Sequence, residues 1–254
     1  MAEKGTGDRS LWSRHEMKYL ISESTAAGIT QYIKAYTCFD RHSEFKPNNA
    51  YMINSVYLDS DTMKLCRESL EGTRNRFKLR VRSYTDDTDY PRFFEIKRRV
   101  NTIIIKSRAR VMCHSVKPLL TGSMVALPDH DTESENLRQF LLYMNSISAL
   151  PVVGVRYLRQ AYEGIVDDRV RITLDRELSC NVTRDALIRS DGPGWHLLPM
   201  SNKVILEIKF TGTYPAWIDR LVKYFGIKTQ SVSKYANSIK HSCMLRFCAP
   251  KVSA

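Results

Sequence analysis

The sequence lacks the features that mark several large classes of protein. None of its six cysteines forms a Cys-x-x-Cys pair, and no spacing of His or Cys matches a zinc site. No apolar run approaches the roughly 20 residues that a membrane-spanning helix needs. There is no low-complexity stretch, proline-rich linker or block of like charges. We therefore expect reduced thiols, no transmembrane segment and an ordered globular fold.

The two ends of the chain carry little pattern. Residues 1–10 are polar and contain no apolar segment typical of a secretory signal. We interpret residues 1–12 as a flexible leader, 13–240 as a single domain and 241–254 as a C-terminal tail. These features predict a cytoplasmic protein.

Acidic residues are the minority among the charges. The 254-residue chain has 39 Lys plus Arg against 27 Asp plus Glu, which gives a formal net charge of +12. An excess of this size favours a polyanionic partner, such as nucleic acid, a membrane surface or a phosphate-rich small molecule. No RRM, KH or helix-turn-helix signature is present, so we do not expect nucleic acid as the main partner.

Eight segments alternate charged and apolar residues with the period of two that a pleated strand requires. They are 14–21, 53–59, 74–84, 93–99, 103–112, 152–161, 169–176 and 204–210. Short polar links between several of them predict a mainly antiparallel sheet. Helical patterns lie at 24–37, 61–70, 134–148 and 214–225. We expect 178–202 to form a long loop, and 228–254 shows no pattern that we can assign.

The polar faces of these strands are nearly all charge. The segment 74–84, for example, places Arg76, Lys78, Arg80 and Arg82 on one face. A solvated outer face is the simplest explanation for an alternating strand. However, cations of one sign on adjacent strands would repel one another on a bare surface.

If the strands closed into a barrel with this face inward, the charged residues would line an interior that could bind an anion. An eight-stranded barrel has room for side chains or one small ligand. Arginine matches the geometry of phosphate oxygens and lysine supplies a point charge, while the few glutamates would neutralise neighbours or hold a divalent cation. We therefore predict an α+β fold: an eight-stranded antiparallel β-barrel, or tunnel, with a charged interior and flanking helices.

The series of segments resembles the VTC domain, the polyphosphate polymerase domain of the vacuolar transporter chaperone family. That family belongs to the triphosphate tunnel metalloenzymes, which are related to CYTH domains. The resemblance covers about residues 13 to 240. It rests on RHEMKYLI, INSVYLDS, KLRVRSY, FFEIKRR with IIIKSRARV, VGVRYLRQAY, RVRITLDRE, VILEIKF and SVSKYANSI. Each motif is weak alone, whereas their order and spacing are specific.

The resemblance implies an ATP-dependent polyphosphate polymerase, which transfers the terminal phosphate of ATP onto a growing polyphosphate chain and uses Mn²⁺ or Mg²⁺. It assigns catalytic phosphate contacts to Arg80, Arg82, Lys97, Arg156 and Arg171. It assigns further phosphate binding to Lys18, Lys106, Arg108, Lys209 and Lys234. Glu207 would hold the metal, and Glu95 would be either a second metal carboxylate or the partner of Lys97.

Two alternatives stay open. The first is a tunnel triphosphatase that hydrolyses tripolyphosphate or nucleoside triphosphates, and the second is a non-catalytic polyphosphate-binding module. The related hydrolases begin with Glu-x-Glu-x-Lys, whereas this chain has Arg14, Glu16 and Lys18. Exchange of the first glutamate for arginine removes one metal carboxylate and favours the polymerase branch.

The sequence also limits how ATP would be held and regulated. It contains neither a P-loop nor a kinase glycine-rich loop, so the triphosphate would be bound through side chains. We find no room for the regulatory domain or membrane helices that accompany this domain in fungal proteins. A membrane-associated partner protein is therefore the expected route to any coupling with a membrane.

Overall fold

The computed structural model describes residues 14–101, 103–123, 132–167 and 169–244. Its strands are β1 (Arg14–Ile21), β2 (Thr37–Phe39), β3 (Tyr51–Asp59), β4 (Arg76–Ser83), β5 (Arg92–Val100), β6 (Ile103–Val111), β7 (Leu150–Gly164), β8 (Arg171–Val182), β9 (His196–Leu197) and β10 (Val204–Thr211). Its helices are α1 (Glu23–Ile33), α2 (Lys64–Glu71), α3 (Cys113–Leu120), α4 (Thr132–Ser146), α5 (Ala216–Tyr224) and α6 (Lys234–Met244), with short 3₁₀ turns η2 (Pro47–Asn49) and η3 (Pro199–Asn202).

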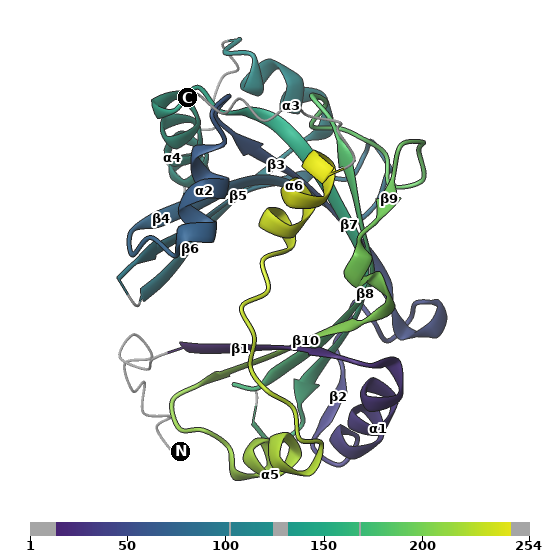
Figure 1. Ribbon diagram of the computed structural model, residues 1–254. Helices are drawn as coiled ribbons and strands as arrows, with labels where there is room; N and C mark the ends of the chain where they lie inside the picture. The colour runs from purple at the N-terminus through teal and green to yellow at the C-terminus, as the bar shows by residue number, and fades with distance from the viewer. Residues whose placement is uncertain (1–13, 102, 124–131, 168, 245–254) are drawn as a thin grey trace, which may run out of the picture. The chain divides into compact units, whose positions relative to one another are not determined.

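The main strands form one sheet in the order β1-β10-β8-β7-β3-β4-β5-β6, with β2 paired to β7 and β9 paired to β8 (Figure 1). The pairs β1–β10, β10–β8, β3–β4, β4–β5 and β5–β6 are antiparallel. The α+β class and the antiparallel sheet of eight main strands are thus confirmed. No helix in the described part of the chain is long and apolar enough to cross a membrane.

The chain divides into two compact units. Unit 1 comprises residues 1–51, 159–176 and 202–232, and unit 2 comprises 52–158, 177–201 and 233–254. Strands β7 and β8 contribute residues to both units. The single domain over 13–240 stays a prediction. The predicted leader and most of the predicted tail lie outside the described residues, and α6 includes residues 241–244 of that tail.

Unit 1 packs α1 and α5 against the apolar face of β1, β10 and β8 (Figure 1). Alternate strand residues such as Tyr19 and Leu206 are buried against Ile29 of α1 and Leu221 of α5. Ser22 caps the N-terminus of α1, because its hydroxyl accepts a hydrogen bond from the backbone N–H of Thr25 at 3.0 Å.

Unit 2 is built on four consecutive strands, β3 to β6, whose apolar face is covered by α3 and α4. Leu79 and Ile96 are buried beneath these helices. Phe94 of β5 meets Phe140 of α4 edge to face at 4.8 Å. Because side chains alternate along a strand, the charged residues between these apolar positions lie on the other face.

The structure corrects the prediction for residues 178–202 and places two unassigned helices. Strand β8 continues to Val182, and β9 and η3 lie further along the same segment. Residues 178–181 are all buried, so the strand shows no alternation by which the sequence could reveal it. Helix α3 carries an internal proline, Pro118, which obscured its pattern, and α6 lies in the segment that could not be assigned.

Candidate functional site

One face of unit 2 carries a grid of cations on β4, β5 and β6. The strand register places Arg80 opposite Glu95 and Glu95 opposite Arg108. In the next row of the register, three lysines lie side by side on the three strands. We call this surface the cationic face: Arg76, Lys78, Arg80, Arg82, Glu95, Lys97, Arg99, Lys106, Arg108 and Arg110. It holds nine cations and one carboxylate.

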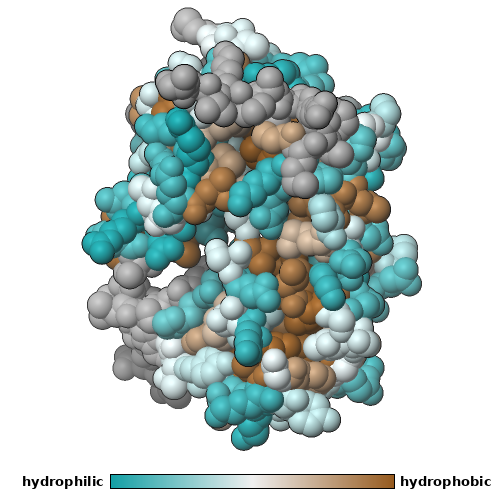
Figure 2. Space-filling view, in the orientation of Figure 1, coloured by the Kyte–Doolittle hydropathy of each residue, from teal (hydrophilic) through white to brown (hydrophobic). Residues whose placement is uncertain are grey.

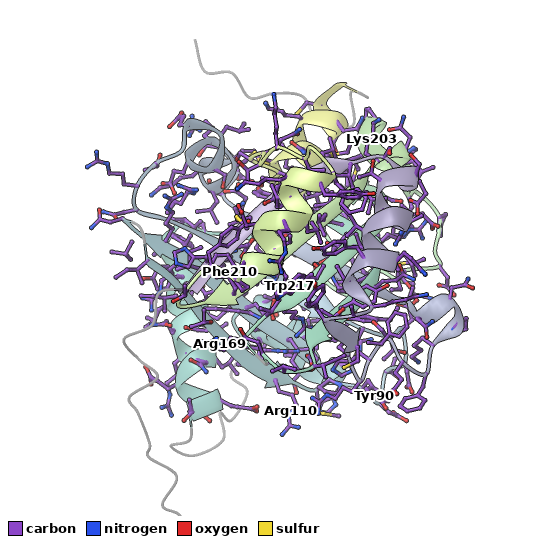
Figure 3. All side chains as sticks on the ribbon, turned by 90° about the horizontal axis from the view of Figure 1, so that it is seen from below. Tyr90, Arg110, Arg169, Lys203, Phe210 and Trp217 are labelled. Carbon is purple, nitrogen blue, oxygen red and sulfur yellow. The ribbon has the colours of Figure 1, made fainter. Side chains whose placement is uncertain are left out.

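The row of lysines is the most crowded part of the cationic face. Lys78 lies opposite Lys97, and Lys97 lies opposite Lys106. Like charges at directly opposite positions destabilise a sheet. At the end of the face, Arg110 projects away from the ribbon (Figure 3) and pairs with Glu133 of α4 at 3.6 Å. The tip of the β5–β6 hairpin is mixed, because Val100, Ile103 and Ile104 are exposed there, and the space-filling view shows hydrophilic and hydrophobic side chains side by side on this surface of the molecule (Figure 2).

Glu95 is the counterion of this face. Its carboxylate is 1% exposed, and Arg80 contacts it through two nitrogens at 2.6 Å. Lys106 contacts the other oxygen at 2.9 Å, while Arg82 and Arg108 lie at 3.8 and 3.6 Å. Burial alone would raise the pKa of Glu95, but the field of Arg80, and then of Arg82 and Lys106, holds it well below its usual range.

Hydroxyl groups orient the two central arginines of the cationic face. Arg80 donates to the phenol oxygen of Tyr57 at 3.3 Å. Arg82, which is 6% exposed, donates to Ser55 at 3.1 Å and to the phenol of Tyr157 at 3.4 Å. These contacts fix the planar guanidinium groups before any ligand arrives.

The start of α6 is attached to the same region. The Lys234 ammonium lies 4.8 Å from the centre of the Tyr157 ring, and Lys78 donates to the hydroxyl of Ser233 at 2.9 Å. Tyr235 donates to the fully buried carboxylate of Asp59. That carboxylate also accepts two backbone N–H groups at the first turn of α2. Lys234 is therefore placed near Arg82 by its contact with Tyr157.

Unit 1 carries a second charged surface, on β1, β10, β8 and the end of β7. Lys18 lies opposite Glu207, and Glu16 lies opposite Lys209. We call it the balanced face: Glu16, Lys18, Arg159, Arg171, Thr173, Asp175, Glu207 and Lys209. The Lys18 ammonium lies 3.2 Å from Glu16 and 3.6 Å from Glu207, and Lys209 lies 3.0 Å from Glu207.

Arg159 and Asp175 form the most buried ion pair of the balanced face. They are 8% and 1% exposed, and two parallel hydrogen bonds of 2.6 and 2.7 Å join them. Arg159 also lies 3.9 Å from Glu207. The sequence analysis assigned no role to either residue. Arg159 follows Tyr157 by two positions on β7, which is the spacing that would have placed it on the charged side of the strand.

The structure does not bring Arg156 to either charged face. Its guanidinium lies 4.7 Å from the centre of a Trp195 ring and donates to the carbonyl of Ser190. Arg156 and Tyr157 are neighbours on β7, so they point to opposite sides of the sheet. A Cβ placed on Gly154, two residues earlier, would come within 3.0 Å of Trp195, which confirms the shared side. Arg156 thus holds the 183–195 segment against β7.

Arg171 does lie on the balanced face, but two carboxylates already hold it. Its guanidinium contacts Asp40 at 2.8 Å and Glu163 at 3.7 Å. Asp40 is 1% exposed and also accepts the backbone N–H groups of His42 and Ser43. The charge of Arg171 is therefore largely offset by these two carboxylates.

The family model described as the VTC domain matches residues 13–243. The chain belongs to the VTC domain family. That membership supports a polyphosphate-related function in general terms. No curated protein matches the chain.

Solved structures also resemble this VTC domain chain, and 22 of their chains match. One is a candidate adenylate cyclase from Bacillus halodurans, with 15% identity, a TM-score of 0.48, and coverage of 86% of this chain and 92% of that one. Another is a protein from Pyrococcus horikoshii OT3, with 12% identity, a TM-score of 0.45, and coverage of 90% and 99%.

A divalent metal fits the balanced face of this VTC domain better than the cationic face. Mg²⁺ is usually held by one or two carboxylates plus substrate phosphates rather than by a cage of protein ligands. Glu207 fits that pattern together with Glu16, because the Lys18 ammonium contacts both carboxylates. The Thr173 hydroxyl, opposite Glu207 and 1% exposed, finds no hydrogen-bond partner in the described part of the chain.

The remaining donors argue against an all-protein metal cage. Over residues 14–244, apart from the undescribed gaps, no group of three His, Cys, Asp or Glu side chains is placed to hold a metal ion. Glu95 is surrounded by four cations, so a metal ion there would add positive charge to a crowded group. The arrangement makes Glu95 a counterion of arginine and lysine instead.

Proposed function

We propose that the protein is an ATP-dependent polyphosphate polymerase. The observation that carries the proposal is the cationic face, on which nine cations lie with one buried carboxylate and four of them contact it. Partly buried cations in such a ratio repel one another unless a polyanion lies among them. A linear phosphate chain supplies one negative charge or more per unit and matches the forked donors of arginine.

The proposed reaction needs charge neutralisation more than a covalent nucleophile. A terminal oxygen of the polyphosphate chain would attack the γ-phosphorus of ATP. The bond from that phosphorus to the bridging oxygen would break, and ADP would leave with the electron pair. Arg80 and Arg82 would bind the phosphate oxygens, since Glu95, Tyr57 and Tyr157 already fix their planes.

The balanced face would supply the metal ligand. Glu207 would hold Mn²⁺ or Mg²⁺ together with phosphate oxygens, and the bound ion would neutralise charge on those oxygens. Lys18 and Lys209, which contact Glu207 at 3.6 and 3.0 Å, would orient its carboxylate. Arg159 would hold Asp175 in place beside it through two hydrogen bonds.

The decisive experiment combines activity with a metal-ligand variant. The purified protein is incubated with ATP and Mn²⁺, and the products are separated on a gel stained for polyphosphate. We expect long chains from the wild type and none from Glu207→Gln or Arg82→Gln. Arg189→Gln is the matched control, because Arg189 is exposed and pairs with Asp191 away from both charged faces.

The other outcomes identify the competing functions. Release of orthophosphate without chains would replace the polymerase with a triphosphatase. Intact ATP with every metal and with added primer, together with measurable polyphosphate binding, would leave a non-catalytic binding module.

A further inference from the structure

Tyr57 lies at the junction between the cationic face and the start of α6. It is 7% exposed, and its phenol oxygen accepts a hydrogen bond from Arg80 at 3.3 Å. Its ring stacks on Tyr235 at 4.7 Å between ring centres, with 20° between the planes. Tyr235 in turn donates to Asp59, which caps α2. The ring of Tyr57 is therefore held in one place from both sides.

The N–H groups of the Arg80 guanidinium are only partly used by its two acceptors, Glu95 and Tyr57. An arginine has five N–H groups. Within the described structure, two of its nitrogens bind Glu95 and a third binds Tyr57. The N–H groups that remain are the ones that a phosphate oxygen would receive. The Tyr57 oxygen and a bound phosphate would thus accept hydrogen bonds from the same guanidinium.

We propose that Tyr57 is a positioning residue for Arg80, and that its phenol oxygen competes, once ionised, with a bound phosphate chain for that guanidinium. As a neutral phenol, Tyr57 accepts one hydrogen bond and leaves the charge of Arg80 to the ligand. As a phenolate, it becomes a second buried anion of the face beside Glu95. The inference rests on the proposed function, because it takes the cationic face as the phosphate-binding surface.

The charges around Tyr57 make its ionisation accessible. Burial alone would raise the pKa of Tyr57, but the field of Arg80, followed by those of Lys78 and Arg82, lowers it to about 8. From α6, Tyr235 faces the ring as a neutral group, because burial and Asp59 raise its pKa. The groups that face Tyr57 from β4 are thus cations, and the group from α6 carries no charge.

A bound phosphate chain would reverse this effect. Its negative charge would offset the cations that favour the phenolate, so the pKa of Tyr57 would rise towards its ordinary value. Binding just above the pKa of about 8 would therefore take up a proton. The affinity for polyphosphate would be higher below that pH than above it.

The ionisation is measured directly by the ultraviolet absorbance of tyrosinate, with and without polyphosphate, which is transparent in that range. We expect the wild type to show one tyrosine titrating near pH 8, and Tyr57→Phe to lose that step. Polyphosphate should move the step upwards by about one unit, and the affinity should fall roughly tenfold across it. In Tyr57→Phe the affinity should show no such fall.

Tyr84→Phe is the matched control. Arg82 and Arg108 also lower the pKa of Tyr84 against the effect of burial, and its ring contacts Arg108. This variant should keep the step of Tyr57 and its shift. Because phenylalanine keeps the ring that stacks on Tyr235, thermal unfolding near neutral pH should show Tyr57→Phe to be folded.

Two results would overturn the inference in distinguishable ways. If polyphosphate binds but leaves the tyrosine step in place, or if Tyr57→Phe keeps that step, Tyr57 does not compete for Arg80 and the proposed function stands. If the step is present but polyphosphate fails to bind at any pH, the proposed function fails first and the competition with it.

Discussion

The cationic face of unit 2 and the balanced face of unit 1 use the same alternating strands but neutralise their charges differently. On the cationic face, Glu95 alone serves Arg80, Arg82, Lys106 and Arg108. On the balanced face, carboxylates and cations alternate across the strands. The first arrangement concentrates positive charge around one carboxylate, and the second mixes carboxylates and cations in nearly equal number.

The difference lies in the residues that face each other across the strands. In unit 2 the register sets lysine against lysine, as in Lys78 and Lys97. In unit 1 it sets lysine against glutamate, as in Lys18 and Glu207. The Glu-x-Lys pattern recurs in both units, so the pattern within one strand does not determine the charge of the surface. The partner strand does.

The largest expected difference between the faces is in stability. Glu95→Gln should lower the free energy of unfolding by about 3–5 kcal/mol, because it leaves buried cations without their counterion. Glu207→Gln should cost about 1 kcal/mol, since its lysine partners are partly exposed. Urea unfolding near neutral pH measures both. Equal losses would show that the two carboxylates lie in equivalent environments.

Tyr57 should make the stability of unit 2 depend on pH between 8 and 10. Because the native pKa of Tyr57, about 8, is below its ordinary value of 10.0, ionisation favours the fold. The wild type should gain about 2 kcal/mol over Tyr57→Phe as the pH rises from 8 to 10, and lose it as the pH falls back through 8. Unfolding of both proteins across this range is the measurement. A constant difference would contradict the lowered pKa.

Paired lysine variants compare the anion affinity of the two faces. Lys97→Gln should weaken polyphosphate binding about tenfold, or about 1.4 kcal/mol, because it removes one of three aligned cations. Lys209→Gln should weaken it about threefold, since Glu207 already offsets that charge. Calorimetric titration at low and high salt tests this, because screening should reduce both effects. If Lys209→Gln weakened binding more than Lys97→Gln, the balanced face would be the polyphosphate-binding surface.

Arg156 should have the smallest effect. Arg156→Gln removes a contact with the Trp195 ring worth about 1 kcal/mol and should leave polyphosphate affinity unchanged. Thermal unfolding and a binding titration on the same sample check both statements. A tenfold loss of affinity would return Arg156 to the phosphate-binding surface.

Strands with one charged and one apolar face could be predicted closely from the sequence. The bounds of β1 were predicted residue for residue, and those of β5 and β10 to within one residue at either end. The grid on β4 to β6 followed, because these strands are consecutive and short links fix their pairing. Arg80, Arg82, Lys97, Lys106 and Arg108 were therefore assigned to the surface on which they lie.

Strand β7 shows why the rest could not be predicted. Along residues 155–161 the side of Tyr157 and Arg159 is buried and the side of Arg156 is half-buried. Both sides mix apolar with polar residues, so the sequence pattern does not reveal which arginine points to which side. Arg156 and Arg159 differ by three positions and thus face opposite ways. The choice between them depends on Asp175 of β8 and on Trp195, which lie far along the chain. The role of Glu95 depended in the same way on the cations that β4 and β6 bring to it.

The spacing of the two charged faces along the chain has a consequence for folding. The cationic face comes from residues 76–110 alone, whereas the balanced face joins residues 16–18, 159–175 and 207–209. Closing long loops costs more entropy than forming neighbouring hairpins, so contacts between near residues form sooner. We expect the three-stranded cationic segment to assemble early, when Glu95 is the one carboxylate among the cations of its face. A phosphate-rich anion would then speed the folding of this segment before it occupies the finished surface.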